Sequence, residues 1–205
     1  ASTPGAAAGT VSFSVSALAS TATHLSTGPT WSAATAEYGA TSITIDPDAG
    51  DPITIPLAAG ATLADAVAAI NAGTGSSGVT AAAVNTGSGY RLQVAATTSG
   101  SAASFSVSSP FPAGSDPAVG TRGFVETFAG RDATLDLGGG HVASSPTNTF
   151  ADLLPGVSVT VSAVAFDPVT VSVRSDPDSL AAAMKSLVAA ANDALGTIRT
   201  HTDSK

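Results

Sequence analysis

Short runs in which apolar residues alternate with serine or threonine are the feature that most restricts the fold of this chain. Val11, Phe13 and Val15 alternate with serines, and residues 157–161 and 169–173 repeat the pattern with valines. A period of two places one face of a strand in a core and the other face in solvent. Segments rich in Gly, Pro and Asp separate the runs and favour turns. The chain is therefore expected to be mainly β.

Composition excludes several classes of protein. Of the 205 residues only 11% are charged and none is Cys, whereas soluble domains average about 25% charged residues. The lack of Cys excludes a disulfide scaffold and a Cys-ligated zinc module. A net charge of -8 with seven scattered Lys and Arg residues predicts no nucleic-acid partner. No apolar run reaches the ~18 residues of a membrane span, and no signal-peptide pattern is visible, so no membrane insertion is expected.

Residues 39–109 are expected to form one unit with the element order ββαβββ. Residues 43–57 contain two alternating runs around a Pro/Asp/Gly turn, which is typical of a β-hairpin. Thr62 can cap a following helix, and Asp65 has the spacing of a capping box. Gly73 is expected to end that helix in the left-handed conformation. The helix is predicted over residues 62–72, and further strands are predicted at 79–83, 90–94 and 105–107.

The remainder of the chain predicts a linker, more strands and a terminal helix. Residues 110–122 are rich in Pro, Gly and Ser and are typical of a linker. Pro177 suits the first turn of a helix, and a heptad-like apolar stripe follows it. This stripe is expected to pack on another helix or, alternatively, on a core of the same chain. Its candidate oligomerisation residues are Leu180, Met184, Leu187, Leu195 and Ile198.

No motif carries convincing chemistry. The glycines at 73, 75 and 78 spell G-x-G-x-x-G, but they follow a predicted helix, whereas a dinucleotide site needs them after a strand. The acidic turn at 46–51 has too few oxygen ligands for calcium and suits a solvated turn. Catalytic, cofactor-binding and metal-ligating residues are therefore predicted to be none, and no enzyme is expected. The three histidines, expected in loops or at the surface, are His24, His141 and His201.

Three stretches resemble one bacterial family. Residues 53–71 read Ile-Thr-Ile-Pro-Leu-Ala-Ala-Gly-Ala-Thr-Leu-Ala-Asp-Ala-Val-Ala-Ala-Ile-Asn, which closely resembles a module of flagellar hook-associated proteins and flagellins. Residues 9–19 look like the family's first strand. Residues 130–157, with Asn148-Thr149 before Pro155-Gly156-Val157, resemble the C-terminal half of flagellar cap proteins, also called hook-associated protein 2.

The resemblance implies a mainly β (α+β) fold with two β-rich head domains. The outer domain, with one short helix, is inserted into the inner domain, and the start of a C-terminal leg helix follows. The implied division is a disordered tail at 1–9, an inner domain at 10–38 plus 123–174, an outer domain at 39–109, a linker at 110–122 and the leg helix at 175–205. Because the chain begins without Met and ends inside a helical pattern, we expect it to be part of a longer protein.

The function implied by the resemblance is structural. Such proteins form a homo-oligomeric cap at the tip of the flagellar filament, outside the cell, and promote assembly of exported flagellin subunits. Export without a cleavable signal peptide is expected. Two alternatives stay open: an extracellular adhesin or recognition module for host surface glycans, using residues 19–38 and 108–122, and another flagellin-like or hook-associated filament protein.

Overall fold

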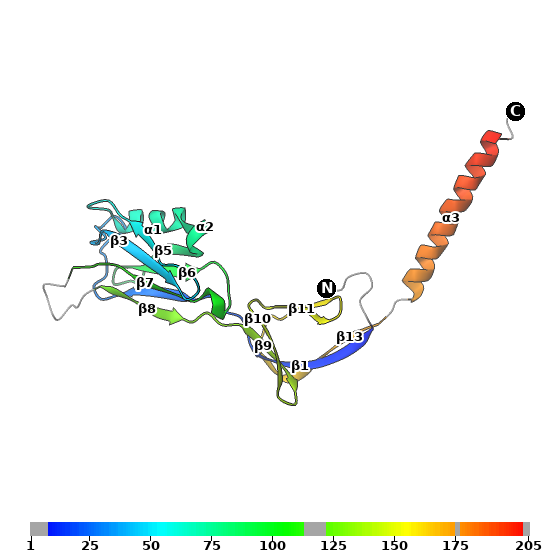
Figure 1. The fold of residues 1–205 in the computed structure, drawn as a ribbon, viewed down its shortest axis with the longest axis horizontal. Helices are drawn as coiled ribbons and strands as arrows, with labels where there is room; N and C mark the ends of the chain where they lie inside the picture. The colour runs from blue at the N-terminus through cyan, green and yellow to red at the C-terminus, as the bar shows by residue number, and fades with distance from the viewer. Residues whose placement is uncertain (1–7, 113–121, 175–176, 203–205) are drawn as a thin grey trace.

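The computed structural model describes residues 8–112, 122–174 and 177–202. Two β lobes and one long helix follow each other along an extended molecule (Figure 1). The mainly β fold expected from the sequence is confirmed. Most of the expected tail and linker, residues 1–7 and 113–121, lies outside the described part of the chain.

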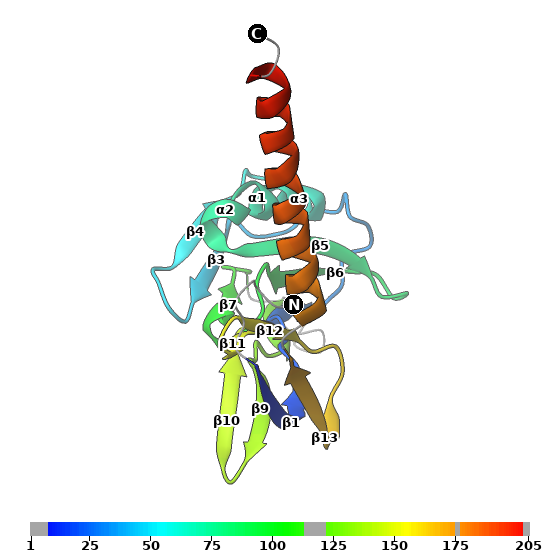
Figure 2. The ribbon, with the colours of Figure 1, turned by 90° about the vertical axis from the view of Figure 1, so that its right-hand side faces the viewer.

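The first lobe is a sandwich of two antiparallel sheets with one helix at its side. One sheet has the order β5-β6-β2-β8 and the other has the order β4-β3-β7. Helix α1 lies beside β5 and buries Leu63, Ala66 and Ile70 in the shared core (Figure 2). The elements are β2 (Thr23–Thr27), β3 (Ser42–Pro47), β4 (Ile53–Pro56), α1 (Leu63–Ala72), α2 (Thr74–Ser77), β5 (Val79–Asn85), β6 (Tyr90–Ala96), the 3-10 turn η1 (Ser101–Ala103), β7 (Phe105–Ser108) and β8 (Gly123–Phe128).

Local chemistry decides where α1 begins but not where the helical conformation ends. The amide of Asp65 donates to Thr62 Oγ1 at 3.2 Å, and Asp65 Oδ2 accepts from the Thr62 amide at 2.9 Å. The predicted capping box is therefore confirmed. Gly73 is the C-cap of α1, as predicted, but the predicted left-handed conformation is wrong, because its φ is -94° and the chain continues into α2. The left-handed residue is Gly78, at φ 66°. Helical turns persist because the amides of Ser76 and Ser77 bond to Gly73 O.

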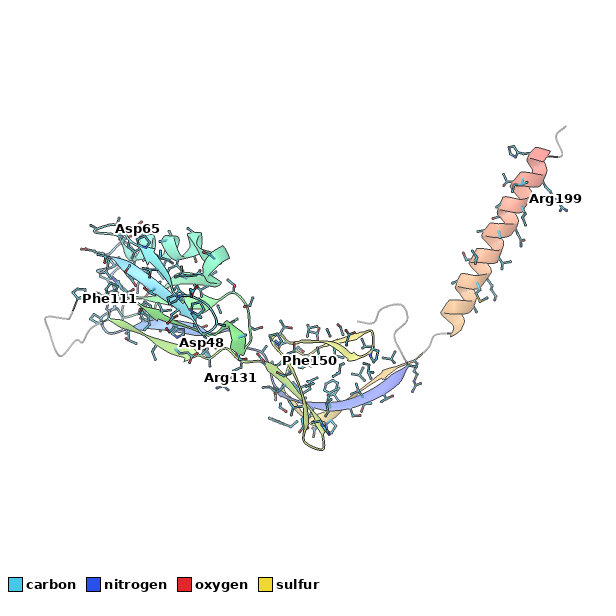
Figure 3. The ribbon with its side chains drawn as sticks, viewed as in Figure 1. Asp48, Asp65, Phe111, Arg131, Phe150 and Arg199 are labelled. Carbon is cyan, nitrogen blue, oxygen red and sulfur yellow. The ribbon has the colours of Figure 1, made fainter. Side chains whose placement is uncertain are left out.

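The second lobe is a twisted four-stranded sheet covered by a hairpin. The sheet order is β10-β9-β1-β13, and β11 pairs with β12 over one face. Phe150 of β11 lies between the hairpin and the sheet (Figure 3) and packs with Phe13 of β1. Positive φ angles at Gly138, Gly139 and Gly140 form the turn of the β9–β10 hairpin. The elements are β1 (Gly9–Ala17), β9 (Ala133–Gly138), β10 (His141–Ser145), β11 (Thr149–Leu154), β12 (Val157–Thr160) and β13 (Ala165–Val173).

Strands β2 and β8 pair inside the first lobe, unlike the grouping expected from the sequence. That grouping placed residues 10–38 and 123–174 together. In the structure β2 lies between β6 and β8, with His24 opposite both Val94 and Glu126. The sequence signal failed here because the buried side chains of β2, which are Thr23, His24 and Ser26, are polar. No alternation of apolar residues therefore marks this strand.

A junction of backbone hydrogen bonds joins the two lobes. Ser20 and Arg131 exchange two bonds, at 2.9 and 3.1 Å, and the amide of Gly100 donates to Ser20 O at 3.1 Å. Gly100 and Gly130 are both buried at this point. A Cβ atom on Gly130 would lie only 2.6 Å from Gly100 O. The junction therefore leaves no room for a side chain at Gly130.

Helix α3 (Pro177–Thr202) leads away from both lobes (Figure 1). Its 26 residues span about 39 Å at about 1.5 Å per residue. Every side chain described in this helix, from Ala181 to His201, is exposed.

Candidate functional site

The apolar stripe of α3 is the principal candidate surface. Four of its five predicted residues are described, and with the neighbouring Val188 they are between 59% and 72% exposed. Leu180 lies in α3, but its side chain is outside the described part of the structure. Large apolar side chains gain ~1.5–3 kcal/mol each when buried. A continuous exposed row of them therefore favours contact with another surface. The described stripe residues are Met184, Leu187, Leu195 and Ile198.

The spacing of the stripe follows a straight helix and departs from a heptad. Its members from Leu180 to Ile198, with Ala191 included, are separated by four, three, four, four and three residues. The two consecutive steps of four at Ala191 break the heptad-like alternation expected from the sequence. Five steps cover 18 residues, or 3.6 per step, which is the period of a straight α-helix. The stripe therefore stays on one face without left-handed supercoiling.

An aromatic cluster closes one end of the first lobe. The rings of Trp31 and Tyr38 stack with centroids 5.5 Å apart, and Phe111 lies 5.0 Å from Tyr38. The Arg122 guanidinium lies 4.6 Å from the Trp31 ring, and its Nε donates to Pro29 O at 3.0 Å. Burial raises the pKa of Tyr38 well above its ordinary value and lowers the pKa of Arg122. The cluster holds three separate chain segments together.

His24 is a buried residue that the sequence reasoning placed at the surface. It lies in β2 with 6% of its surface exposed, and its ring is 4.7 Å from Phe105. Its Nδ1 is buried and has no hydrogen-bond partner among the described residues. Burial lowers the pKa of His24, while the charges of Glu126 and Asp48 partly oppose the shift. The prediction for His24 is therefore wrong, because pairing with β6 and β8 encloses the strand.

The remaining candidate residues do not converge on one site. His141 and His201 are exposed, as predicted. The acidic turn carries exposed carboxylates at Asp46, Asp48 and Asp51. In the described ranges, no three His, Asp or Glu side chains gather into a group that could hold a metal ion. None of the described helices combines the length and the apolar character that crossing a membrane requires.

Two protein families match separate parts of the chain. The family described as "Flagellin hook IN motif" matches residues 39–98, and "Flagellar hook-associated protein 2 C-terminus" matches residues 130–205. The first match covers α1 and its neighbouring strands, and the second covers β9 to α3. No curated protein matches the chain.

Solved structures of flagellar cap proteins share the fold. The D2-D3 domains of flagellar cap protein FliD from Escherichia coli are 25% identical with a TM-score of 0.70, covering 86% of this chain and 93% of that chain. The D1-D2-D3 domains of the same protein are 26% identical with a TM-score of 0.72, covering 96% and 68%. FliD (HAP2) from Pseudomonas aeruginosa PAO1 shares the fold at 22% identity, with a TM-score of 0.73 and coverage of 94% and 91%.

The first family match lies in the first lobe, and the second match covers β9 to β13 of the second lobe together with helix α3. Cap-protein structures align across nearly all of this arrangement. The match to the hook-associated protein 2 C-terminus and the alignment with cap-protein structures therefore support a flagellar cap protein, also called flagellar hook-associated protein 2.

Proposed function

We propose that this chain forms the head and the start of a leg helix in a filament cap protein. The observation that carries the proposal is the match to the hook-associated protein 2 C-terminus over residues 130–205, which joins the second lobe to α3. The cap would stand at the distal tip of the flagellar filament, outside the cell. There it would promote assembly of exported flagellin subunits, which are its proposed partners.

The domain division follows the same proposal. Residues 39–109 are the core of an inserted outer head domain, between the two segments that form the inner head domain. The backbone pairing of β2 with β6 on one side and with β8 on the other favours including β2 and β8 in the outer domain. The outer domain would then begin after Ser20 and end before Arg131.

The α3 stripe is the proposed packing surface of the leg. Leu180, Met184, Leu187, Leu195 and Ile198 would contact a helix of the same full-length subunit or of its neighbour in a homo-oligomer. The exposure of the four described residues supports this role. The period of 3.6 residues favours a partner that lies along a straight helix face.

Neither alternative function has a supporting observation in the described residues. Within residues 19–38, the rings of Trp31 and Tyr38 are buried and Trp31 lies beneath Arg122, so neither ring is open to stack on a glycan. The match to the C-terminal family distinguishes the chain from proteins that share only the module at 39–98. The cap role is therefore the single function proposed.

Deletion of the full-length parent gene in its host tests the proposal. We expect loss of swimming, with unpolymerised flagellin released into the medium and detected by blotting. Re-expression of the parent gene should restore filaments. Normal filaments in the deletion strain would contradict the cap role. Parent protein distributed along the filament shaft by immuno-electron microscopy would favour a filament building block instead.

A further inference from the structure

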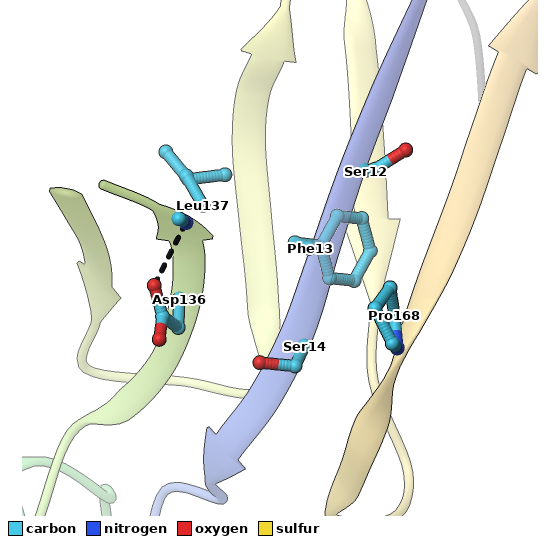
Figure 4. Close-up of a pocket in the computed structure, with 7 residues that line it drawn as sticks. Ser12, Phe13, Ser14, Asp136, Leu137 and Pro168 are labelled. Carbon is cyan, nitrogen blue, oxygen red and sulfur yellow. Dashed lines mark hydrogen bonds between the residues drawn. The ribbon is translucent and has the colours of Figure 1, made fainter. Parts of the chain in front are cut away.

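A cleft of about 320 Å³ opens in the second lobe across β1, with β9 on one side and Pro168 of β13 on the other. Figure 4 shows β1 in the centre and β9 curving away from it, with the lining side chains around the gap. Ser12, Ser14 and Asp136 supply its polar atoms. Phe13, Leu137 and Pro168 supply its apolar wall. The family matches assign no role to this cleft.

The cleft exists because the ladder between β1 and β9 is shorter than the strand. Strand β1 pairs with β13 from Gly9 onward, but it pairs with β9 only from Ser14 onward. The β9–β10 hairpin turns away through three consecutive glycines with positive φ, Gly138 to Gly140. Among the described residues, β1 therefore has no strand neighbour on the β9 side from Gly9 to Phe13. An open strand edge of this kind is a template for an added strand.

The polar wall of the cleft carries one charge, and it is negative. Asp136 Oδ1 accepts from the Gly138 amide at 2.8 Å (Figure 4), which leaves the second carboxylate oxygen to other donors. Ser12 Oγ is bonded to Thr170 Oγ1 at 2.9 Å, so its orientation is fixed. No Lys or Arg lines the cleft. The wall is therefore suited to a cationic donor and unsuited to an anion.

The apolar wall suits the aliphatic stem of a long cationic side chain. Phe13 is buried and Leu137 is 38% exposed, and both side chains line the cleft. Lys and Arg place their methylene groups along apolar surface while the charged end reaches a polar partner. A stem that lies along Leu137 would bring its charge to Asp136, the next residue of β9. The protein's net charge of -8 also favours the approach of a basic partner.

We propose that this cleft binds an extended, basic segment of a partner protein. The backbone of the segment pairs with the open edge of β1 between Gly9 and Phe13. One Arg or Lys side chain of the segment lies against Leu137 and reaches the Asp136 carboxylate. Backbone pairing supplies most of the affinity, and the charge selects the sequence. This interaction is separate from the proposed cap role and can be tested without a flagellum.

The test uses the whole 205-residue chain and a labelled decapeptide, Ser-Thr-Val-Ser-Arg-Ser-Val-Thr-Ser-Lys. Fluorescence polarisation measures affinity, and amide NMR shifts locate the contact. We expect saturable binding, with shifts at Ser12, Ser14 and Gly138. A peptide with Glu in place of Arg should bind at least about tenfold more weakly. A peptide methylated at alternate backbone nitrogens should lose binding, because it cannot pair with a strand edge.

Asp136→Asn should weaken binding of the Arg peptide about fivefold, the size expected of one partly exposed ion pair. Asp51→Asn is the matched control, because it removes the same charge from the exposed turn at 46–51 and should leave the affinity unchanged. Three results would overturn the proposal: no saturable binding, equal binding by the methylated peptide, or equal losses in the two variants. Unchanged amide spectra away from residue 136 check that the variant is folded.

Discussion

Alanine at the two buried glycines of the lobe junction should destabilise the protein by different mechanisms. Gly100 has φ 106° and ψ 159°, a backbone conformation that costs a residue with a side chain ~1–3 kcal/mol. Its Cβ would also lie 2.8 Å from Pro146 Cβ and 3.0 Å from Asp132 Oδ1. Such overpacking typically costs ~1–3 kcal/mol. Gly100→Ala should therefore lower the free energy of unfolding by ~2–6 kcal/mol.

Gly130 and Gly60 separate the cost of crowding from the cost of the backbone conformation. Gly130 does not have positive φ, but its Cβ would lie 2.6 Å from Gly100 O, so Gly130→Ala should cost ~1–3 kcal/mol from crowding alone. Gly60 has φ 74° with no atom within 4 Å of a Cβ. Gly60→Ala should therefore cost ~1–2 kcal/mol from the backbone alone. Gly75 lies in α2 with open space and no positive φ, so Gly75→Ala is the unstrained control and should not lower stability.

Urea unfolding of the four variants, followed by circular dichroism, measures these differences. Fluorescence of Trp31, the single tryptophan, reports separately on the first lobe. Small-angle scattering in native buffer should show a changed maximum dimension for Gly100→Ala and Gly130→Ala only, because only these two disturb the junction. Equal stability of Gly130→Ala and Gly75→Ala would refute the close approach of the two backbones.

Three other predictions follow from the contacts described above. Leu187→Asp in the full-length protein should reduce oligomerisation measured by light scattering, whereas Ser186→Asp, one position away from the stripe, should not; an unchanged Leu187→Asp oligomer would contradict the leg-packing role. Thr62→Ala should destabilise the first lobe by ~1 kcal/mol in urea unfolding, because it removes the cap of α1; stability equal to that of the unaltered chain would show that the cap contributes little. Because burial lowers the pKa of His24, the unfolded chain takes up a proton at a higher pH than the folded chain, so stability should fall as the pH drops below about 6.5. Urea unfolding at pH 7.5 and 5.0 measures this loss of stability. His24→Phe should lose less stability between the two pH values, and an equal loss would show that another group is responsible.

Locally encoded features were the most predictable part of the fold. Thr62 and Asp65 form their cap within one turn, and the alternation around Phe13 places that side chain in a core. These signals require no knowledge of distant residues. The position of the left-handed residue was missed by five positions, at Gly78 instead of Gly73, because hydroxyl-rich residues between them sustain another helical turn.

Features that depend on distant pairing could not be read from the sequence. Strand β2 owes its place to β6 and β8, which lie about 70 and 100 residues further along the chain, and its buried His24 and Ser26 carry no apolar signal. The α3 stripe was visible as a local period. Its exposure was not, because the same period describes a helix packed on its own core. The cleft beside β1 arises from the divergence of β9; the glycines at 138–140 indicate a turn but not the direction in which the strand diverges.

The paired backbones of Ser20 and Arg131 have a consequence for how this molecule can vary in length. The chain leaves and re-enters the second lobe at two residues already hydrogen-bonded to each other. The segment between Ser20 and Arg131 begins and ends at adjacent positions, so if this segment were removed, a tight turn would be enough to reconnect the two residues. Enlarging or removing the first lobe is therefore expected to leave β1 and β9 in place, because the ends of the insertion stay adjacent whatever lies between them.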